Sequence, residues 1–262
     1  MTTLAPSPPI AQHYFLPEGY RARVHNQTLD APESSATYWT PQRIADAAKY
    51  QTHVYRLAAK LIVRCRLRSV LDVGCGPGTK LATIIAPVCR DIEGLDQESG
   101  VRAARACGTP GRYTAADLER PAITPWRKFD LIICADVIEH LVDPDPMLRM
   151  IRSLCHDRTI IVLSTPERHR LRGRDCNSSD KPEHVREWSR NEFLRFLRSR
   201  NLRVIASRLY PQDNTPLRAG AIAELKFRLR IGLRSPWCCH AAICSAAGPD
   251  QVPPEGLEPS TR

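Results

Sequence analysis

The chain has 262 residues and a formal net charge of +10, with 42% hydrophobic and 25% charged residues. This length suits one large domain with a single core, and the near-average composition excludes a disordered or fibrous protein. No apolar run reaches the roughly 18 residues of a membrane span, and residues 1–10 lack the basic and apolar parts of a secretion signal. We therefore expect a cytoplasmic protein without a membrane partner.

The positive charge comes mostly from arginines scattered along the chain, with local runs at residues 64–68, 168–174 and 226–234. Stacking on nucleic-acid bases needs aromatic side chains between the basic ones, and only Phe227 stands within such a run. We favour a solvated basic surface, with a nucleic-acid partner as the alternative.

The ten cysteines raise the question of disulfides or a metal site. Cys238, Cys239, His240 and Cys244 lack the two-residue spacer of a zinc knuckle. Five others fall inside apolar periodic segments, where a free cysteine behaves as a small hydrophobe: Cys65, Cys75, Cys107, Cys134 and Cys155. We expect reduced cysteines that pack in the core.

The predicted elements begin after residues 1–37, an N-terminal tail or extension whose first dozen residues are rich in proline and serine. Thr40 followed by Pro41 is typical of a helix start. Apolar residues then recur at helical spacing as far as Cys65, which predicts one amphipathic helix or a pair of them.

Short apolar strands then alternate with helices. Strands are predicted at 69–74, 91–96, 112–117, 129–135 and 159–164, and helices at 79–88, 99–106 and 144–154. The continuous apolar runs at 131–134 and 159–163 suit strands buried on both faces. The pattern therefore predicts a doubly wound, Rossmann-like α/β fold.

A polar stretch at 166–188 is too long for an ordinary connection and predicts a lid-like insertion that folds over a substrate, or a disordered insertion. A helix at 189–200, a strand at 202–210, a helical or irregular crossover at 217–233 and a last strand at 237–244 should follow. Residues 248–262 are rich in proline, glycine and serine and predict a disordered C-terminal tail.

The strongest motif runs from Val70 to Lys80, where a strand enters a glycine-rich turn that opens a helix. Glycines at Gly74, Gly76 and Gly78 allow a ligand to approach the backbone closely. The start of the following helix offers free N–H groups that suit a carboxylate. Such a turn also serves dinucleotides, so it identifies no cofactor by itself.

Two acidic residues end the next two strands. Asp96 lies about 20 residues beyond the glycine turn, where a carboxylate can accept hydrogen bonds from both ribose hydroxyls. Asp117 ends the third predicted strand, and Leu118 follows it. One acidic strand end could be explained by solvation alone, but two in register after a glycine turn favour a ligand site.

From Tyr38 to Tyr210 the chain resembles class I S-adenosylmethionine-dependent methyltransferases of the type 11/23 kind, and most closely ubiquinone-pathway and other small-molecule methyltransferases. The resemblance implies a domain at 38–247, the strand order 3-2-1-4-5-7-6 with the last strand antiparallel, and S-adenosyl-L-methionine as cofactor. In such a family Asp96 would bind the ribose, Asp117 the adenine amino group, and the backbone of Ala135 the adenosyl group. The resemblance also places Asp72, Gly74, Gly76, Gly78 and Leu118 in the cofactor site.

The resemblance further implies that the loop from Val137 to Pro144 binds cofactor and acceptor. A hydroxyl acceptor needs a general base, and His140 and His184 are the candidate catalytic residues, each with a purely structural alternative. The segment 38–55 often caps the cofactor in this family, although its Tyr55 has the spacing of a core residue.

We predict methyl transfer to a small-molecule or saccharide-like acceptor. The alternatives are an RNA or protein methyltransferase, an NAD-dependent dehydrogenase, and a cofactor-binding protein without activity. The Asn-Pro-Pro-Tyr tetrad of enzymes that methylate base amino groups is absent, which argues against that reaction.

Asp136, Glu139 and His140 resemble part of the metal site of small-RNA 2′-hydroxyl methyltransferases and of some ubiquinone-pathway enzymes. Carboxylates and imidazoles can hold a divalent ion. The RNA family has a glutamate where Asp136 stands, and no second nearby histidine can be matched in the sequence. We therefore predict no metal.

Overall fold

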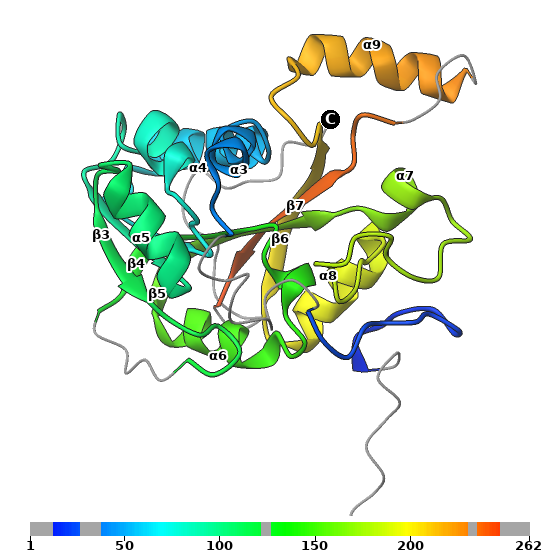
Figure 1. Ribbon diagram of the computed structural model, residues 1–262, viewed down its shortest axis with the longest axis horizontal. Coiled ribbons are helices and arrows are strands. Elements are labelled where there is room, and N and C mark those ends of the chain that lie inside the picture. Colours follow the sequence, from blue (N-terminus) through cyan, green and yellow to red (C-terminus); the bar gives the residue numbers. More distant parts are fainter. Residues whose placement is uncertain (1–12, 27–37, 122–126, 230–234, 247–262) are drawn as a thin grey trace, which may run out of the picture.

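The computed structural model describes residues 13–26, 38–121, 127–229 and 235–246. Its centre is one seven-stranded sheet in the order β3-β2-β1-β4-β5-β7-β6 (Figure 1). The strand β7 runs antiparallel to β5 and β6, and the other neighbouring pairs are parallel. The predicted strand order and the antiparallel last strand are confirmed.

The strands lie close to their predicted positions, and two of them differ from the predicted length by two residues or more. The third strand ends at Ala115 instead of 117, because the carboxylate of Asp117 accepts the backbone N–H groups of Glu119 and Arg120 and turns the chain. The fifth strand is longer than predicted because Cys155 pairs with Phe129 of β4 at its start, and Thr165 and Pro166 pair with β7 at its end. The strands are β1 Ser69–Val73, β2 Asp91–Asp96, β3 Arg112–Ala115, β4 Phe129–Ala135, β5 Cys155–Pro166, β6 Arg203–Tyr210 and β7 Cys239–Ser245.

The N-terminal helical region consists of two helices, and the crossover after β6 is helical over its first part. The helix predicted at 79–88 contains a π-helical turn, in which the N–H of Ala86 reaches the carbonyl of Leu81. The helices are α3 Pro41–Ala47, α4 Thr52–Cys65, η1 Leu81–Ile85, α5 Glu98–Ala106, η2 Ile138–His140, α6 Asp145–Ser153, α7 Arg168–Arg172, α8 Arg190–Ser199 and α9 Leu217–Arg228.

The sheet is covered on both faces, as the continuous apolar strands predict. Alternate residues of β5 point to opposite sides: Ile160 and Val162 pack with α4, η1 and α5, whereas Ile161 and Leu163 pack with α6 and α8. All four side chains are fully buried. The doubly wound α/β architecture is therefore confirmed.

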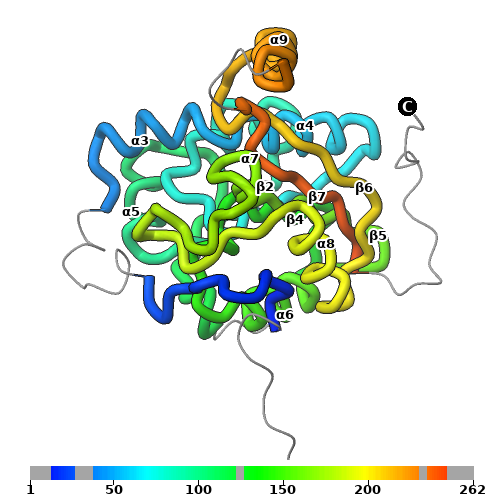
Figure 2. Tube along the Cα trace, turned by 90° about the vertical axis from the view of Figure 1, so that its right-hand side faces the viewer, coloured from blue at the N-terminus to red at the C-terminus, as the bar shows by residue number. Residues whose placement is uncertain are grey.

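Residues 13–26, which we assigned to an extension outside the domain, contribute to its core. Tyr14, Leu16 and Tyr20 are each 7% exposed and belong to the cluster beneath α6 and α8. This segment lies beside residues 177–188, to which it is joined by backbone hydrogen bonds from Arg21 and Arg23 (Figure 2).

The segment 166–188 is ordered and partly buried in the domain, so the alternative of a disordered insertion is wrong, whereas its role as a lid stays a prediction. Arg168, Arg186 and Trp188 are at most 1% exposed, and a β-bridge joins Glu167 to Trp188. Two arginines of the segment, Arg168 and Arg172, make ion pairs with Glu192 and Glu187. Sequence polarity misled the prediction because these charges neutralise one another inside the fold.

Among the described helices, none has the length and apolar character needed to cross a membrane. All ten cysteines are free, and Cys238, Cys239 and Cys244 are buried, as predicted for core residues. The prediction is wrong for Cys107, which is exposed. The predicted C-terminal tail lies outside the described residues.

Candidate functional site

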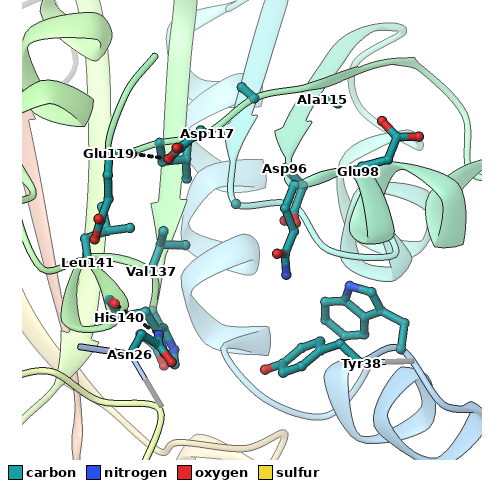
Figure 3. Close-up of a pocket in the computed structure, with 16 residues that line it drawn as sticks. Asn26, Tyr38, Asp96, Glu98, Ala115, Asp117, Glu119, Val137, His140 and Leu141 are labelled. Carbon is teal, nitrogen blue, oxygen red and sulfur yellow. Dashed lines mark hydrogen bonds between the residues drawn. The ribbon is translucent and has the colours of Figure 1, made fainter. Parts of the chain in front are cut away.

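A cavity of about 700 Å³ opens at the edge of the sheet where β1, β2, β3 and β4 end (Figure 3). Parallel strands of a doubly wound sheet bring their carboxyl ends, and the loops that follow, to this edge. The cavity is lined by Asn26, Tyr38, Trp39, Gly74, Asp96, Gln97, Glu98, Ala115, Ala116, Asp117, Leu118, Glu119, Asp136, Val137, His140 and Leu141.

The glycine turn follows β1 and forms one wall. Gly74 has φ +78°, and a Cβ atom there would collide with the side chain of Val137. Gly76 and Gly78 also have positive φ, but the space for their Cβ atoms is taken by Trp39 and by Thr109 with Tyr113. Gly74 lines the cavity, whereas Gly76 and Gly78 shape the turn and are not among the lining residues.

Asp96 ends β2 at the wall of the same cavity. Its Oδ2 accepts the N–H of Gly76 at 2.7 Å, which ties the acidic strand end to the glycine turn. Burial raises the pKa of Asp96 to about 6, although the hydrogen bond from Gly76 opposes that rise. The carboxylate thus sits where the resemblance places the ribose, and its charge depends on pH near neutrality.

Asp72, in the middle of the glycine motif, does not line the cavity. It is fully buried within β1, and its Oδ2 accepts the hydroxyl of Tyr55 from α4 at 2.8 Å. Burial raises its pKa to about 7. Tyr55 is the core residue that its spacing predicted, and it carries the contact between α4 and the cofactor motif.

The third strand brings Asp117 and Leu118 into the cavity wall. Asp117 holds the turn after β3, and its Oδ1 accepts the N–H of Glu119 at 2.9 Å. The side chain lies across the cavity from Glu98 (Figure 3). Asp117 and Asp96 thus line one cavity from successive strands, the relation that the sequence predicted.

Ala135, the last residue of β4, is 8% exposed and is followed directly by Asp136, which lines the cavity. Asp136 adopts φ +53°, an unusual conformation for a residue with a Cβ atom. Ser164 donates to its Oδ1 at 2.5 Å and Gln51 donates to its Oδ2 at 3.1 Å. These contacts hold the strained turn and connect it to the N-terminal helices.

The N-terminal region supplies three further lining residues. Tyr38 and Trp39 precede α3, and Figure 3 shows Tyr38 on the opposite side of the cavity from His140. Asn26 donates to the carbonyls of His140 and Glu183, both at 3.1 Å. No local pattern marks Asn26 for this role, because it lies in a segment without helical or strand periodicity.

The two candidate catalytic histidines are neighbours in space, although 44 positions separate them in the sequence. The ring centroids of His140 and His184 are 4.9 Å apart and the rings meet edge to face. His140 lines the cavity, whereas His184 is 3% exposed and does not line it. Only His140 can therefore touch a bound acceptor directly.

Each histidine has its Nδ1 engaged. Nδ1 of His140 lies 2.8 Å from the carbonyl of Glu183, and Nδ1 of His184 lies 2.6 Å from Oε1 of Glu187. Because a carbonyl and a carboxylate accept, Nδ1 carries the proton in each neutral ring and Nε2 keeps its lone pair. Burial, with the neighbouring His184, lowers the pKa of His140 to about 3, so this ring is neutral at neutral pH.

Glu187 is the residue that sequence reasoning missed. It is fully buried, and its Oε1 also contacts Arg172 and Ser179. Burial alone would raise its pKa, but the hydrogen bonds from His184 and Arg172 lower that pKa to about 2. Glu187 therefore stays charged and orients His184.

Glu139 completes a possible ligand set with the two histidines. One ligand atom from each of Glu139, His140 and His184 lies within 4.8 Å of the others. Glu139 is fully buried; its Oε2 accepts the hydroxyl of Thr165, while its Oε1 has no hydrogen-bond partner among the residues that the structure describes. An orphaned buried carboxylate oxygen beside two imidazoles fits a divalent cation.

The prediction that no metal binds assumed that a second nearby histidine was lacking. The fold supplies it in His184, and Glu187 stands behind it as carboxylates commonly stand behind metal-bound histidines. Asp136, the other residue of the sequence comparison, instead hydrogen-bonds Ser164 and Gln51.

Comparison with known proteins identifies the family to which this fold belongs. The methyltransferase-domain family Methyltransf_23 matches residues 48–207, which include β1 to β5, the glycine turn and both histidines. The chain belongs to this family. The predicted class I methyltransferase family, with S-adenosylmethionine as its cofactor, is thereby confirmed.

Two curated relatives show the range of similarity to this methyltransferase. The ubiquinone biosynthesis O-methyltransferase of Bordetella avium is 31% identical over 107 residues, 39% of this chain and 44% of that protein. A protein of Mycolicibacterium smegmatis described as a probable S-adenosylmethionine-dependent methyltransferase is 31% identical over 151 residues, 55% of this chain and 56% of that protein. The chain thus spans about half the length of the curated relatives it matches.

Solved structures share the fold at low sequence identity. The plantazolicin methyltransferase BpumL, in complex with S-adenosylhomocysteine, superposes with a TM-score of 0.55 at 15% identity, covering 86% of this chain and 94% of that one. A TehB-like methyltransferase from Corynebacterium glutamicum gives 0.53 at 18% identity, covering 82% and 99%. These likenesses concern the fold alone.

Proposed function

We propose that this protein transfers the methyl group of S-adenosylmethionine to a hydroxyl oxygen of a small-molecule or saccharide-like acceptor. The observation that carries the proposal is the position of His140. Its imidazole lines the same cavity as Gly74 and Asp96, so an acceptor beside it would also lie beside the cofactor. Methyl transfer is an in-line displacement that requires this alignment.

In this proposal the cofactor is held by the residues that the resemblance selects. Asp96 accepts the ribose hydroxyls, Asp117 the adenine amino group, and Gly74 lets the methionine part approach the backbone. Leu118 packs against the adenine, and Ala135 supplies a backbone contact. Asp72, Gly76 and Gly78 support the turn without touching the ligand.

Neutral His140 has an unprotonated Nε2 that can accept a hydrogen bond from an acceptor hydroxyl. It is a poor final proton store, because burial and the adjacent His184 disfavour a charged ring. His184, which Glu187 orients, packs edge to face against His140 and positions that ring. His140 thus contacts the acceptor, and His184 acts through it.

The same residues would hold a divalent cation through Glu139, His140 and His184. When bound, such an ion would polarise the acceptor hydroxyl and lower its pKa. A hydroxyl acceptor gains most from this arrangement, because an amine acceptor needs no ionisation before it attacks.

A small acceptor is favoured by the cavity, whose volume of about 700 Å³ lies within the range of small-molecule sites. The Bordetella avium relative is likewise named as an O-methyltransferase. The net charge of +10 is the observation in favour of RNA as acceptor.

The test is formation of S-adenosylhomocysteine with phenolic and saccharide acceptors, in comparison with RNA and unmodified protein. We expect turnover with a small hydroxyl compound, a loss of about 100-fold or more in His140→Ala, and unchanged cofactor binding in that variant. Turnover on RNA alone, with steep salt dependence, would contradict the acceptor class. Binding of Mn²⁺ by calorimetry, lost in His184→Ala, is the separate readout for the metal.

A further inference from the structure

The helix α9 (Leu217–Arg228) joins β6 to β7 and projects from the body of the protein in both views (Figures 1 and 2). Its inner face is fixed to the domain. Glu224 is 9% exposed and accepts hydrogen bonds from Arg170 of α7 at 2.5 Å and from Ser235 at 2.6 Å. Gly220 is also buried, and a Cβ atom at this position would lie 3.1 Å from the side chains of both Pro211 and Trp237. These contacts decide which face of α9 points outward.

The outward face is apolar. Ile222, Leu225 and Leu229 are 60%, 58% and 60% exposed, and their spacing of three and four residues places them in one stripe along the helix. Leu217, at the start of α9, is a further exposed leucine at 41%. Of the eight large hydrophobic side chains that are exposed in the described part of the chain, three thus lie on α9 and a fourth, Leu229, directly follows it. Clustered exposure of this kind indicates a binding surface.

Basic side chains surround the stripe. At 100° per residue, Lys226 and Arg228 fall on its two flanks and Arg218 falls within its first turn. All three are exposed. Arg228 makes an ion pair with Glu224, whereas Arg218 and Lys226 make none with any residue that the structure describes. The helix therefore combines an apolar stripe with unneutralised positive charge.

We propose that α9 docks this protein on the surface of an anionic membrane. Ile222, Leu225 and Leu229 would enter the boundary between headgroups and acyl chains, while Arg218 and Lys226 meet the lipid phosphates. In this arrangement α9 lies on the membrane surface and does not cross the bilayer. The finding that no described helix can span a membrane therefore does not concern this mode of binding. A symmetric contact with a second copy is disfavoured, because it would bring the same positive charges face to face.

The placement of α9 gives this docking a consequence for the acceptor. The strand β6 runs parallel to β5, because both are antiparallel to β7, so α9 leaves the sheet at the edge that also carries Gly74, Asp96 and Asp136. Docking through α9 would therefore bring the cavity edge toward the lipid surface. This consequence rests on the proposed function, whereas the docking itself does not.

The experiment is co-sedimentation of the full-length protein with vesicles of phosphatidylcholine alone or with 30 mol% phosphatidylglycerol (about one anionic lipid in three). We expect binding to the anionic vesicles that weakens as salt rises. Replacing both charges in Arg218→Gln/Lys226→Gln should weaken binding about 30-fold, at roughly 1 kcal/mol for each basic residue. The pair Ile222→Ser/Leu225→Ser should weaken it at least about tenfold.

The matched control is Val63→Ser, which removes a 64% exposed apolar side chain from α4 and should leave vesicle binding unchanged. Thermal unfolding and S-adenosylhomocysteine binding of each variant verify that the fold is retained. Equal sedimentation with neutral and anionic vesicles, or no sedimentation of the wild type, would overturn the proposal. So would a concentration-dependent dimer that Ile222→Ser/Leu225→Ser abolishes, which would make the second copy the occupant of the stripe.

Discussion

Two residues of the glycine motif, Asp72 and Gly74, are separated by a single residue but have different structural roles. Gly74 forms the cavity wall under Val137, whereas Asp72 is sealed inside β1 beneath Tyr55. The first is constrained by space and by its positive φ. The second is constrained by the free energy of burying a charge, which raises its pKa. Substitutions at the two positions should therefore fail in different ways.

Gly74→Ala should weaken S-adenosylhomocysteine binding by at least about tenfold and lower stability, because the added methyl group collides with Val137 at a strained φ. Gly108→Ala is the matched control. It also has positive φ, +62°, but its Cβ would meet no atom within 4 Å. Calorimetric titration of both variants separates steric blocking from backbone strain; equal affinities would contradict the assignment of Gly74 to the cavity wall.

Asp72→Asn should flatten the dependence of folding stability on pH. The carboxyl has a pKa of about 7 in the folded protein against 3.8 unfolded, so the folded state binds more protons between these values and loses stability as pH rises through this range. Between pH 5 and pH 8 the wild type should lose about 3 kcal/mol that the variant keeps. Urea unfolding at the two pH values measures the difference. A wild type as stable at pH 8 as at pH 5 would sink the assignment.

At the scale of elements, the segment from Glu183 to Trp188 connects parts of the chain that are distant in sequence. Its backbone N–H at Val185 bonds the carbonyl of Glu139, and the guanidinium of Arg186 bonds the carbonyls of Leu141 and Val142. It therefore fixes the loop after β4 that carries His140. The N-terminal segment covers it from outside through Tyr20 and Tyr14.

Tyr20→Phe should therefore destabilise the protein by about 1–3 kcal/mol, because the Tyr20 hydroxyl accepts the N–H of Glu187 at 2.8 Å and its loss leaves a buried donor without a partner. Tyr50→Phe is the control, since Tyr50 is 43% exposed. The free energy of unfolding from urea titrations provides the comparison. A loss no larger in Tyr20→Phe than in Tyr50→Phe would show that the N-terminal segment does not hold residues 183–188.

For the whole molecule, ligand binding and folding should be linked. The cavity is lined by residues at the ends of β1 to β4 and by Asn26, Tyr38 and Trp39 of the N-terminal region. S-adenosylhomocysteine at 100 times its Kd should add about 2.7 kcal/mol to stability and raise Tm by roughly 5–10 °C. NAD should have no effect, and Asp96→Ala should remove the shift. Thermal unfolding with each ligand tests this; stabilisation by NAD alone would contradict the cofactor assignment.

The strands of the sheet, the glycine turn and the position of Asp96 and Asp117 at its edge could all be predicted from the sequence. These features are local, since apolar runs bury strands, positive-φ glycines shape a turn, and parallel strands bring their ends to one edge. The pairing of Asp96 with Gly76 follows from that arrangement.

The packing of the charged segment at 166–188 depends on contacts with distant parts of the chain and became visible in the fold. The fold also places His184 beside His140 and Glu139. From composition alone, Arg168, Arg172 and Glu187 would be expected on the solvated surface. Composition cannot show the ion pairs that neutralise these charges inside the protein. The outward direction of the apolar stripe on α9 was likewise set by Glu224 and Gly220, whose partners lie elsewhere in the chain. Long-range contacts between charged or apolar side chains leave no periodic signal in the sequence, so the fold alone could assign them.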